Sequence, residues 1–131
     1  MITKDGVMPL LLQACPSFQS GRQRYAKTEG QDLLYVSLGN FADHLLELHQ
    51  KNHTDEFPAV ADAIERLHVE GDHYVIEAAT IGLLEGIQNV WANKRVDPEL
   101  FYPLLRPQSA KWWQSLNDFW QGKIGFVGDG L

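Results

Sequence analysis

A single run of apolar residues constrains the fold of this chain more than any other feature of its sequence. Within residues 29–52, apolar side chains recur at alternating spacings of four and three, at Leu34, Leu38, Phe41, Leu45 and Leu48. This spacing places them along one stripe of an α-helix. The stripe is widened by Tyr35, Ala42 and Leu46. We therefore expect a central helix that its neighbours cover on more than one side.

The remainder of the chain repeats the helical spacing, whereas alternating Val, Ile and Thr runs hardly occur. The pattern predicts an all-α fold, a compact bundle of five or six helices in a single domain over residues 1–131. Capping and helix-breaking residues set the other boundaries. The first expected helix covers residues 3–14, and the second is the central helix of residues 29–52. The third is capped by Thr54 or Asp55 and ended by Gly71, and the fourth runs from Asp72 to Lys94. A short Pro-marked helix begins at Asp97 and Pro98, and a last helix runs from Ser109 to Gln121. Short links between the second, third and fourth helices predict antiparallel neighbours.

Two stretches lack the helical pattern. Residues 15–31 are polar and rich in turn-forming residues, so we expect a loop there, which includes a basic cluster of Arg22, Arg24 and Lys27. A glycine-rich tail follows the Trp-rich last helix, and its Ile124, Phe126 and Val127 are expected to dock on the core. The stripe of the last helix, which we expect to pack in the core, comprises Trp112, Trp113, Leu116, Phe119 and Trp120.

Negative charge is concentrated in the middle of the chain. The net charge is −6, and residues 43–85 alone hold ten acids against Lys51 and Arg66. This balance disfavours nucleic-acid binding, which needs clustered Lys and Arg. Solvated helix faces are one explanation of the acids, and a surface that binds a basic protein partner is the other. The candidate residues of that surface are Asp43, Glu47, Asp55, Glu56, Asp62 and Glu65.

The single cysteine, Cys15, excludes an intramolecular disulfide and fits a reducing compartment. It lies among apolar neighbours, which favours a buried thiol over a nucleophile. We expect no signal peptide, because no basic segment followed by a long apolar run begins the chain. No run approaches the ~18 apolar residues of a membrane span. The sequence thus predicts a cytoplasmic protein that is not bound to a membrane.

Histidines and acids offer incomplete metal and catalytic patterns. His49 and His53 stand four apart near a helix end, a spacing that lets two histidines share a metal ion. Glu65 and His68 form one Glu-x-x-His pair, but a di-iron bundle needs two such pairs within helices. No complete catalytic motif is present, so we expect a non-enzymatic protein without a cofactor. A metal- or small-ligand-binding protein that uses His49, His53 and nearby carboxylates remains the alternative.

Two glycines interrupt the fourth helix, in the sequence TIGLLEGIQNVW. On a helical wheel, Gly82 and Gly86 fall on one flank of the buried face, whereas Glu85 and Asn89 fall nearly opposite it. Each glycine costs about 0.8–1 kcal/mol of helix propensity relative to alanine. We therefore expect a close neighbour on the glycine flank, with a Trp of the last helix as the candidate.

The sequences IGLLEGIQNVW and FYPLLRPQSAKWWQSLNDFWQG resemble an uncharacterised family of small bacterial all-helical domains. The resemblance covers mainly residues 75–122. It implies a stand-alone domain of the kind met near toxin genes as candidate immunity proteins. A protein-binding domain of immunity type, which neutralises a basic toxin through the acidic helical surface, is the resulting functional hypothesis. A homodimer through an exposed Trp112 or Trp113 is a further possibility.

Overall fold

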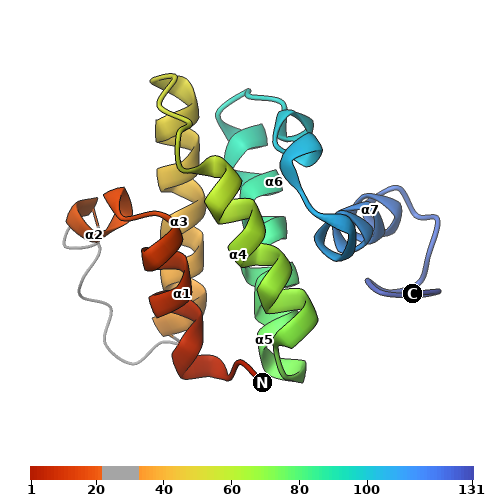
Figure 1. Ribbon diagram of the computed structural model, residues 1–131. Helices are drawn as coiled ribbons and strands as arrows, with labels where there is room; N and C mark the ends of the chain where they lie inside the picture. Colours follow the sequence, from red (N-terminus) through yellow and green to blue (C-terminus); the bar gives the residue numbers. More distant parts are fainter. Residues whose placement is uncertain (22–32) are drawn as a thin grey trace.

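The computed structural model describes residues 1–21 and 33–131 (Figure 1). Over these residues the chain forms helices and no strand, so the expected all-α bundle is confirmed. The α-helices are α1 (Val7–Ala14), α2 (Ser17–Gly21), α3 (Leu33–Gln50), α4 (Phe57–Glu70), α5 (His73–Glu77), α6 (Glu85–Asn93) and α7 (Pro107–Trp120). A π-helical segment, η3 (Ala78–Leu84), joins α5 to α6 without a break, and short 3-10 turns are η1 (Lys4–Gly6), η4 (Pro98–Leu100) and η5 (Tyr102–Leu104).

Three long helical segments, which we call rods, form the centre of the bundle: α3, α4 and the continuous segment α5–η3–α6. In Figure 1, α3 and the rod α5–η3–α6 run side by side in the same direction, and α4 runs the opposite way in front of them. Consecutive rods are thus antiparallel, as predicted, and the first and third are parallel. Helix α1 packs on α4, and α7 lies to one side, also against α4. None of the helices within the described residues is long and apolar enough to cross a membrane.

Small residues set the register of the two parallel rods. Gly82 lies against Leu38, and Gly86 lies against Ala42. The ring of Trp91 lies 4.8 Å from that of His49, so both residue numbers rise together along the interface. The aromatic ring that lies on the glycine flank is therefore that of Tyr35 of α3, 3.2 Å from the Cβ position of Gly82. The expected Trp of the last helix does not lie there.

Capping side chains fix several helix ends. Asp72 accepts a hydrogen bond from the Val75 amide at 2.9 Å, and Asp97 accepts one from the Glu99 amide at 2.9 Å, as the sequence predicts. The expected cap of α4 is wrong, because Glu56 occupies that position and its side chain bonds elsewhere. Ile2 exchanges backbone hydrogen bonds with the α4–α5 turn, which ties the start of the chain to the bundle.

The aromatic stripe and the tail depart from expectation. Trp113 is fully buried and Trp112 is partly buried, but Trp120 is 63% exposed because it lies at the free end of α7. Phe126 of the tail is 62% exposed and does not dock on the core, whereas Val127 packs against it. The expected loop over residues 15–31 is also corrected, since residues 17–21 form α2, and the basic cluster Arg22, Arg24 and Lys27 lies outside the described residues.

Candidate functional site

Four of the six predicted acids are engaged within the molecule. Glu47 pairs with Lys51 at 2.8 Å, and Asp62 pairs with Arg106 at 2.8 Å. Glu65 bonds to the first residues of α7, and Glu56 bonds to Ser17 and Cys15. Asp43 and Asp55 are exposed. The structure therefore does not bring the six acids together as one uncommitted face.

A smaller acidic surface lies on the outer side of the α3–α6 contact. In two parallel helices that touch at Ala42 and Gly86, the residue after the first and the residue before the second lie on the same side. These two residues are Asp43 and Glu85, which both reach solvent. The corresponding residues on the opposite side, Phe41 and Ile87, are fully buried.

The same outer side continues along both helices. Glu47 follows Asp43 by one turn of α3, and the exposed Asn89 follows Glu85 by one turn of α6. Partial burial raises the pKa of the Asp43 carboxyl, and the charge of Lys94 opposes that shift. We call Asp43, Glu47, Glu85 and Asn89 the outer acidic surface. It faces away from α4, which runs across the other side of the two rods (Figure 1).

The predicted histidine pair is split. Helix α3 ends at Gln50, so His49 lies in the helix and His53 lies in the following link. The ring of His49 packs against Trp91, which commits it to the interface between the rods. Over the described residues, no group of three or more His, Cys, Asp or Glu side chains is placed to hold a metal ion.

A buried polar cluster lies where α4, η3 and α7 meet. The ring of His68 on α4 has its Nδ1 atom 3.0 Å from the carbonyl oxygen of Ile64 and 3.0 Å from Ser109 Oγ. Its Nε2 atom is 3.0 Å from Thr80 Oγ of the π-helical segment. Glu65 accepts hydrogen bonds from the amides of Gln108 and Ser109 and from the Ser109 hydroxyl, at 2.9–3.0 Å.

The hydrogen-bond directions in this cluster differ from those of a catalytic serine–histidine pair. A carbonyl only accepts, so Nδ1 of His68 carries a proton, which is shared between the Ile64 carbonyl oxygen and Ser109 Oγ at equal distances of 3.0 Å. The hydroxyl proton of Ser109 goes to Glu65. A catalytic serine instead gives its proton to the histidine, while a carboxylate orients the other ring nitrogen. The cluster thus ties three helices together, and Nδ1 of His68 is not placed as a base for Ser109.

Burial controls the charge states in the cluster. It lowers the pKa of His68 to about 4, so the ring is neutral at neutral pH, although hydrogen bonding to Ile64 and the charge of Glu65 oppose the shift. For Glu65, burial is outweighed by the hydrogen bonds from Ser109 and Gln108, which hold the pKa of the carboxyl below its usual value. Neutral His68 leaves Nε2 as an acceptor, so Thr80 has one hydroxyl proton for two acceptors, His68 and the Ile76 carbonyl.

A second cluster joins α2, α3 and the start of α4. Ser17 Oγ lies 2.8 Å from Nε2 of His44 and donates a hydrogen bond to Glu56. The carboxylate also accepts from the Ser17 amide at 3.3 Å and from the Cys15 thiol at 3.5 Å. Because Glu56 takes the hydroxyl proton, His44 does not act as the base for Ser17. Burial raises the pKa of Cys15 to about 11, so its thiol stays protonated, as expected of a core cysteine.

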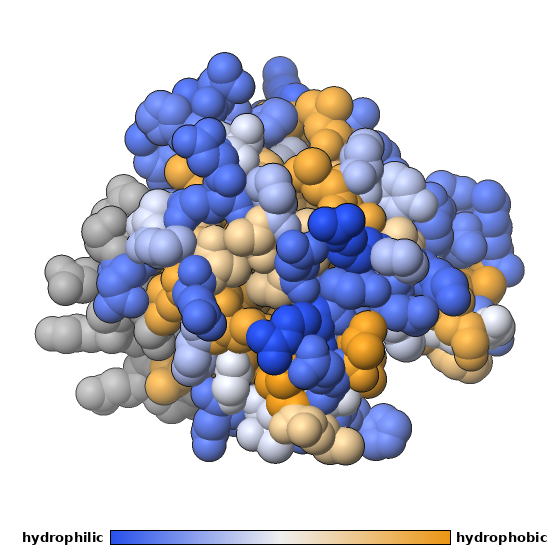
Figure 2. Space-filling model, viewed as in Figure 1, coloured by the Kyte–Doolittle hydropathy of each residue, from blue (hydrophilic) through white to orange (hydrophobic). Residues whose placement is uncertain are grey.

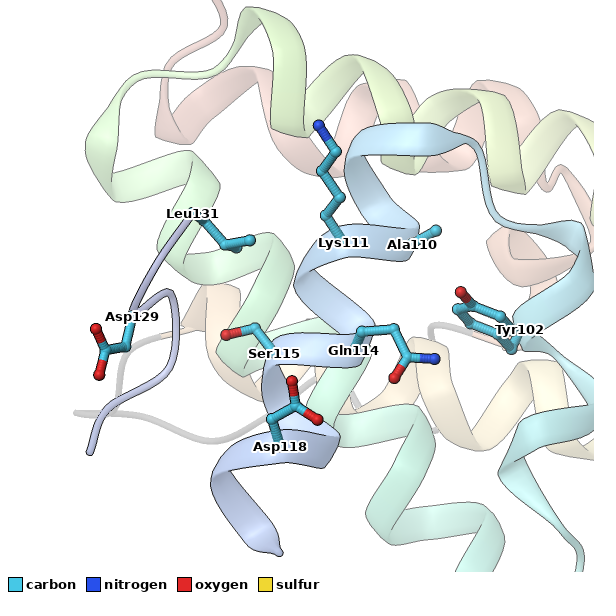
Figure 3. A pocket seen from close by; sticks show the side chains of 8 residues that line it. All are labelled: Tyr102, Ala110, Lys111, Gln114, Ser115, Asp118, Asp129 and Leu131. Atoms are coloured by element: carbon cyan, nitrogen blue, oxygen red, sulfur yellow. The ribbon is translucent and has the colours of Figure 1, made fainter. Parts of the chain in front are cut away.

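The hollows on the surface of the described residues include one between α1 and α4 and one beside α7. A shallow groove of about 340 Å³ runs between α1 and α4, with Ala14, Ala59 and Ala63 among its lining residues. Figure 2 shows hydrophobic and hydrophilic side chains side by side on the face formed by these helices. The other hollow, of about 250 Å³, lies beside α7, where Ser115 points toward Asp129 of the tail and Gln114 points toward Tyr102 (Figure 3).

Sequence reasoning found some members of these sites and missed others. The Glu-x-x-His spacing singled out Glu65 and His68, and both contact Ser109. Nothing in the sequence indicated that Thr80 would contact His68, because a threonine within a helical pattern does not reveal a π-helical segment. Ser17 and His44 are 27 residues apart, and only the fold brings them together.

A family model described as "Domain of unknown function (DUF7674)" matches residues 8–121, and the chain belongs to this family. This finding confirms the resemblance to an uncharacterised domain family and extends it beyond residues 75–122. No curated protein matches the chain, and no solved structure matches it.

Proposed function

We propose that this member of the DUF7674 family is a protein-binding domain that recognises a basic partner through the outer acidic surface of Asp43, Glu47, Glu85 and Asn89. One observation carries the proposal. Asp43 and Glu85 flank the α3–α6 contact on its solvent side, and within the described residues neither makes an ion pair, although the charge of Lys94 acts on Asp43 from a longer distance. Two carboxylates on a rigid helical pair form a fixed site for Lys or Arg.

The charges of the middle segment support this assignment. Both bases of residues 43–85 are already paired one helical turn away, Lys51 with Glu47 and Arg66 with Glu70. The negative field of the other acids is therefore not neutralised within the segment. Such a field accelerates encounter with a positively charged partner and loses strength as salt screens it.

An immunity-type role in the bacterial cytoplasm is the specific form of the proposal. In that role the domain neutralises a basic toxin by covering its positive surface. Such inhibition needs charge complementarity and a rigid surface, and it needs no catalytic group on the binding protein. The two serine–histidine contacts are consistent with this role, because in each a carboxylate takes the serine proton.

The test begins with the basic proteins encoded beside the gene. Each is purified and titrated with the full chain by calorimetry at low and high ionic strength. We expect a one-to-one complex with one of them that weakens as salt rises. The proposal is wrong if none of these proteins binds, or if the affinity of the one that binds does not depend on salt.

A further inference from the structure

The tail, residues 121–131, folds back on α7 through a specific contact. The amide of Gly128 donates a hydrogen bond to Ser115 Oγ at 2.6 Å. The backbone of Gly128 also lies on the indole of Trp112, so that a Cβ atom there would come within 2.8 Å of Trp112 Cζ3. Gly128 has a φ of +96°, which glycine adopts without strain. Both the backbone angle and the ring contact therefore select glycine at this position.

In this contact the residues of α7 are more buried than those of the tail. Ser115 is 4% exposed, and Trp112 stacks at 18° on the ring of the buried His68. By contrast, none of residues 121–131 is buried, and Phe126 and Leu131 are each 62% exposed. The tail thus contributes little buried apolar area, and segments of this kind open at low free energy.

From Gly122 onward, the tail also lies outside the residues that the family model matches. The family model ends at residue 121, where α7 has just finished, and Gly122 follows with a φ of +76°. Trp112 and Ser115 lie within the matched residues, whereas the segment seated on them follows the last matched residue. Beside this surface, the hollow between α7 and the tail is lined by Tyr102, Lys111 and Gln114, which provide further polar groups (Figure 3).

We propose that the α7 surface of Trp112 and Ser115 is a docking site for an extended, glycine-containing peptide, and that the tail occupies it in cis as a releasable strap. Ser115 accepts the backbone N–H of the peptide, and the indole of Trp112 takes the glycine, where any larger residue is excluded. A peptide of the same chemistry in a partner competes with the strap. This site lies on α7 and is independent of the outer acidic surface on α3 and α6.

The probe is a fluorescent peptide of residues 123–131, and its anisotropy measures binding to full-length variants. Gly128→Val removes the strap from its site, because the side chain meets Trp112. Gly130→Val is the matched control, since Gly130 also has a positive φ, of +85°, but no atom lies within 4 Å of its Cβ position. Circular dichroism and thermal unfolding establish that both variants fold.

We expect the Gly128→Val chain to bind the peptide saturably, at least ~10-fold more tightly than the wild-type or Gly130→Val chain, because a tethered strap competes at a high effective concentration. A peptide that carries Gly128→Val should not bind. Equal binding to all three chains, or equal binding of both peptides, would overturn the proposal. Amide hydrogen exchange in the wild-type chain provides an independent test. Gly128 should exchange at least ~100-fold faster than Leu116 of α7, and equal protection of the two amides would show that the strap does not release.

Discussion

Gly82 lies in close contact with Leu38 where the two parallel rods of this protein meet. A Cβ atom built on Gly82 would lie 2.8 Å from Leu38 Cδ1, and the Tyr35 ring stands at 3.2 Å on the same side. One helical turn further on, the Cβ position of Gly86 is 3.6 Å from Ala42, an ordinary contact distance. The two glycines therefore occupy different environments, although the sequence presents them as a pair.

This difference predicts opposite effects of alanine at the two sites. Gly82→Ala should destabilise the fold by about 1 kcal/mol, because overpacking against the fully buried Leu38 outweighs the gain in helix propensity. Gly86→Ala should raise stability by up to ~1 kcal/mol, since the methyl group fits. Urea unfolding of both variants measures the ranking. Equal shifts of the two midpoints would refute the assigned packing.

Glu65 and Asp62 provide a comparison between a partly buried cap and a surface ion pair. Glu65 accepts three hydrogen bonds at the start of α7, so Glu65→Ala should cost about 1–2 kcal/mol. Asp62 and its partner Arg106 are more than half exposed, so Asp62→Ala should change stability by less than ~0.5 kcal/mol. Thermal unfolding distinguishes them, and a larger loss in Asp62→Ala would contradict the role given to Glu65.

His68 predicts that stability falls in mild acid. Burial lowers its pKa from 6.5 to about 4, so between these values the unfolded chain binds a proton that the folded chain does not. The stabilisation is complete above pH 6.5, and about 2 kcal/mol should be lost by about pH 5. The hydrogen-bonded Glu65 carboxylate adds a loss in the same direction at lower pH.

The control for this prediction is His68→Gln, which keeps polar atoms in the cluster and has no titrating ring. Urea unfolding of both chains at a series of pH values gives the slope of stability with pH. The variant should be less stable near neutrality and should lose less stability over the same pH range. Parallel slopes in the two chains would show that His68 is not the titrating group.

Much of the architecture follows from local sequence signals. The four–three spacing on α3 places Leu38, Phe41 and Leu45 in the core, where each is fully buried. Asp72 and Asp97 cap the helices that follow them, because an exposed carboxylate next to free amides is a local arrangement. Signals of this kind are complete within a few residues, so the sequence alone contains them.

The sites depend on relations between distant segments, which local patterns do not contain. Glu56 and Glu65 look like surface acids in the sequence, yet the first bonds to α2 and the second caps α7. The partner of Gly82 depends on the direction and register of α3 against η3. Trp120 follows the apolar stripe but is the last residue of α7 and is exposed, so its burial depends on what surrounds the end of the helix and not on the stripe alone.

The most direct measurement of the central claim is the affinity of the double variant Asp43→Asn/Glu85→Gln for the basic partner. The matched control, Asp62→Asn/Glu70→Gln, removes an equal number of negative charges, but from α4. We predict that the first variant binds at least ~10-fold more weakly, with a shallower dependence on salt, and that the control binds within ~2-fold of the wild type. Equal weakening in both variants would contradict the outer acidic surface, because it would show that net charge alone governs binding.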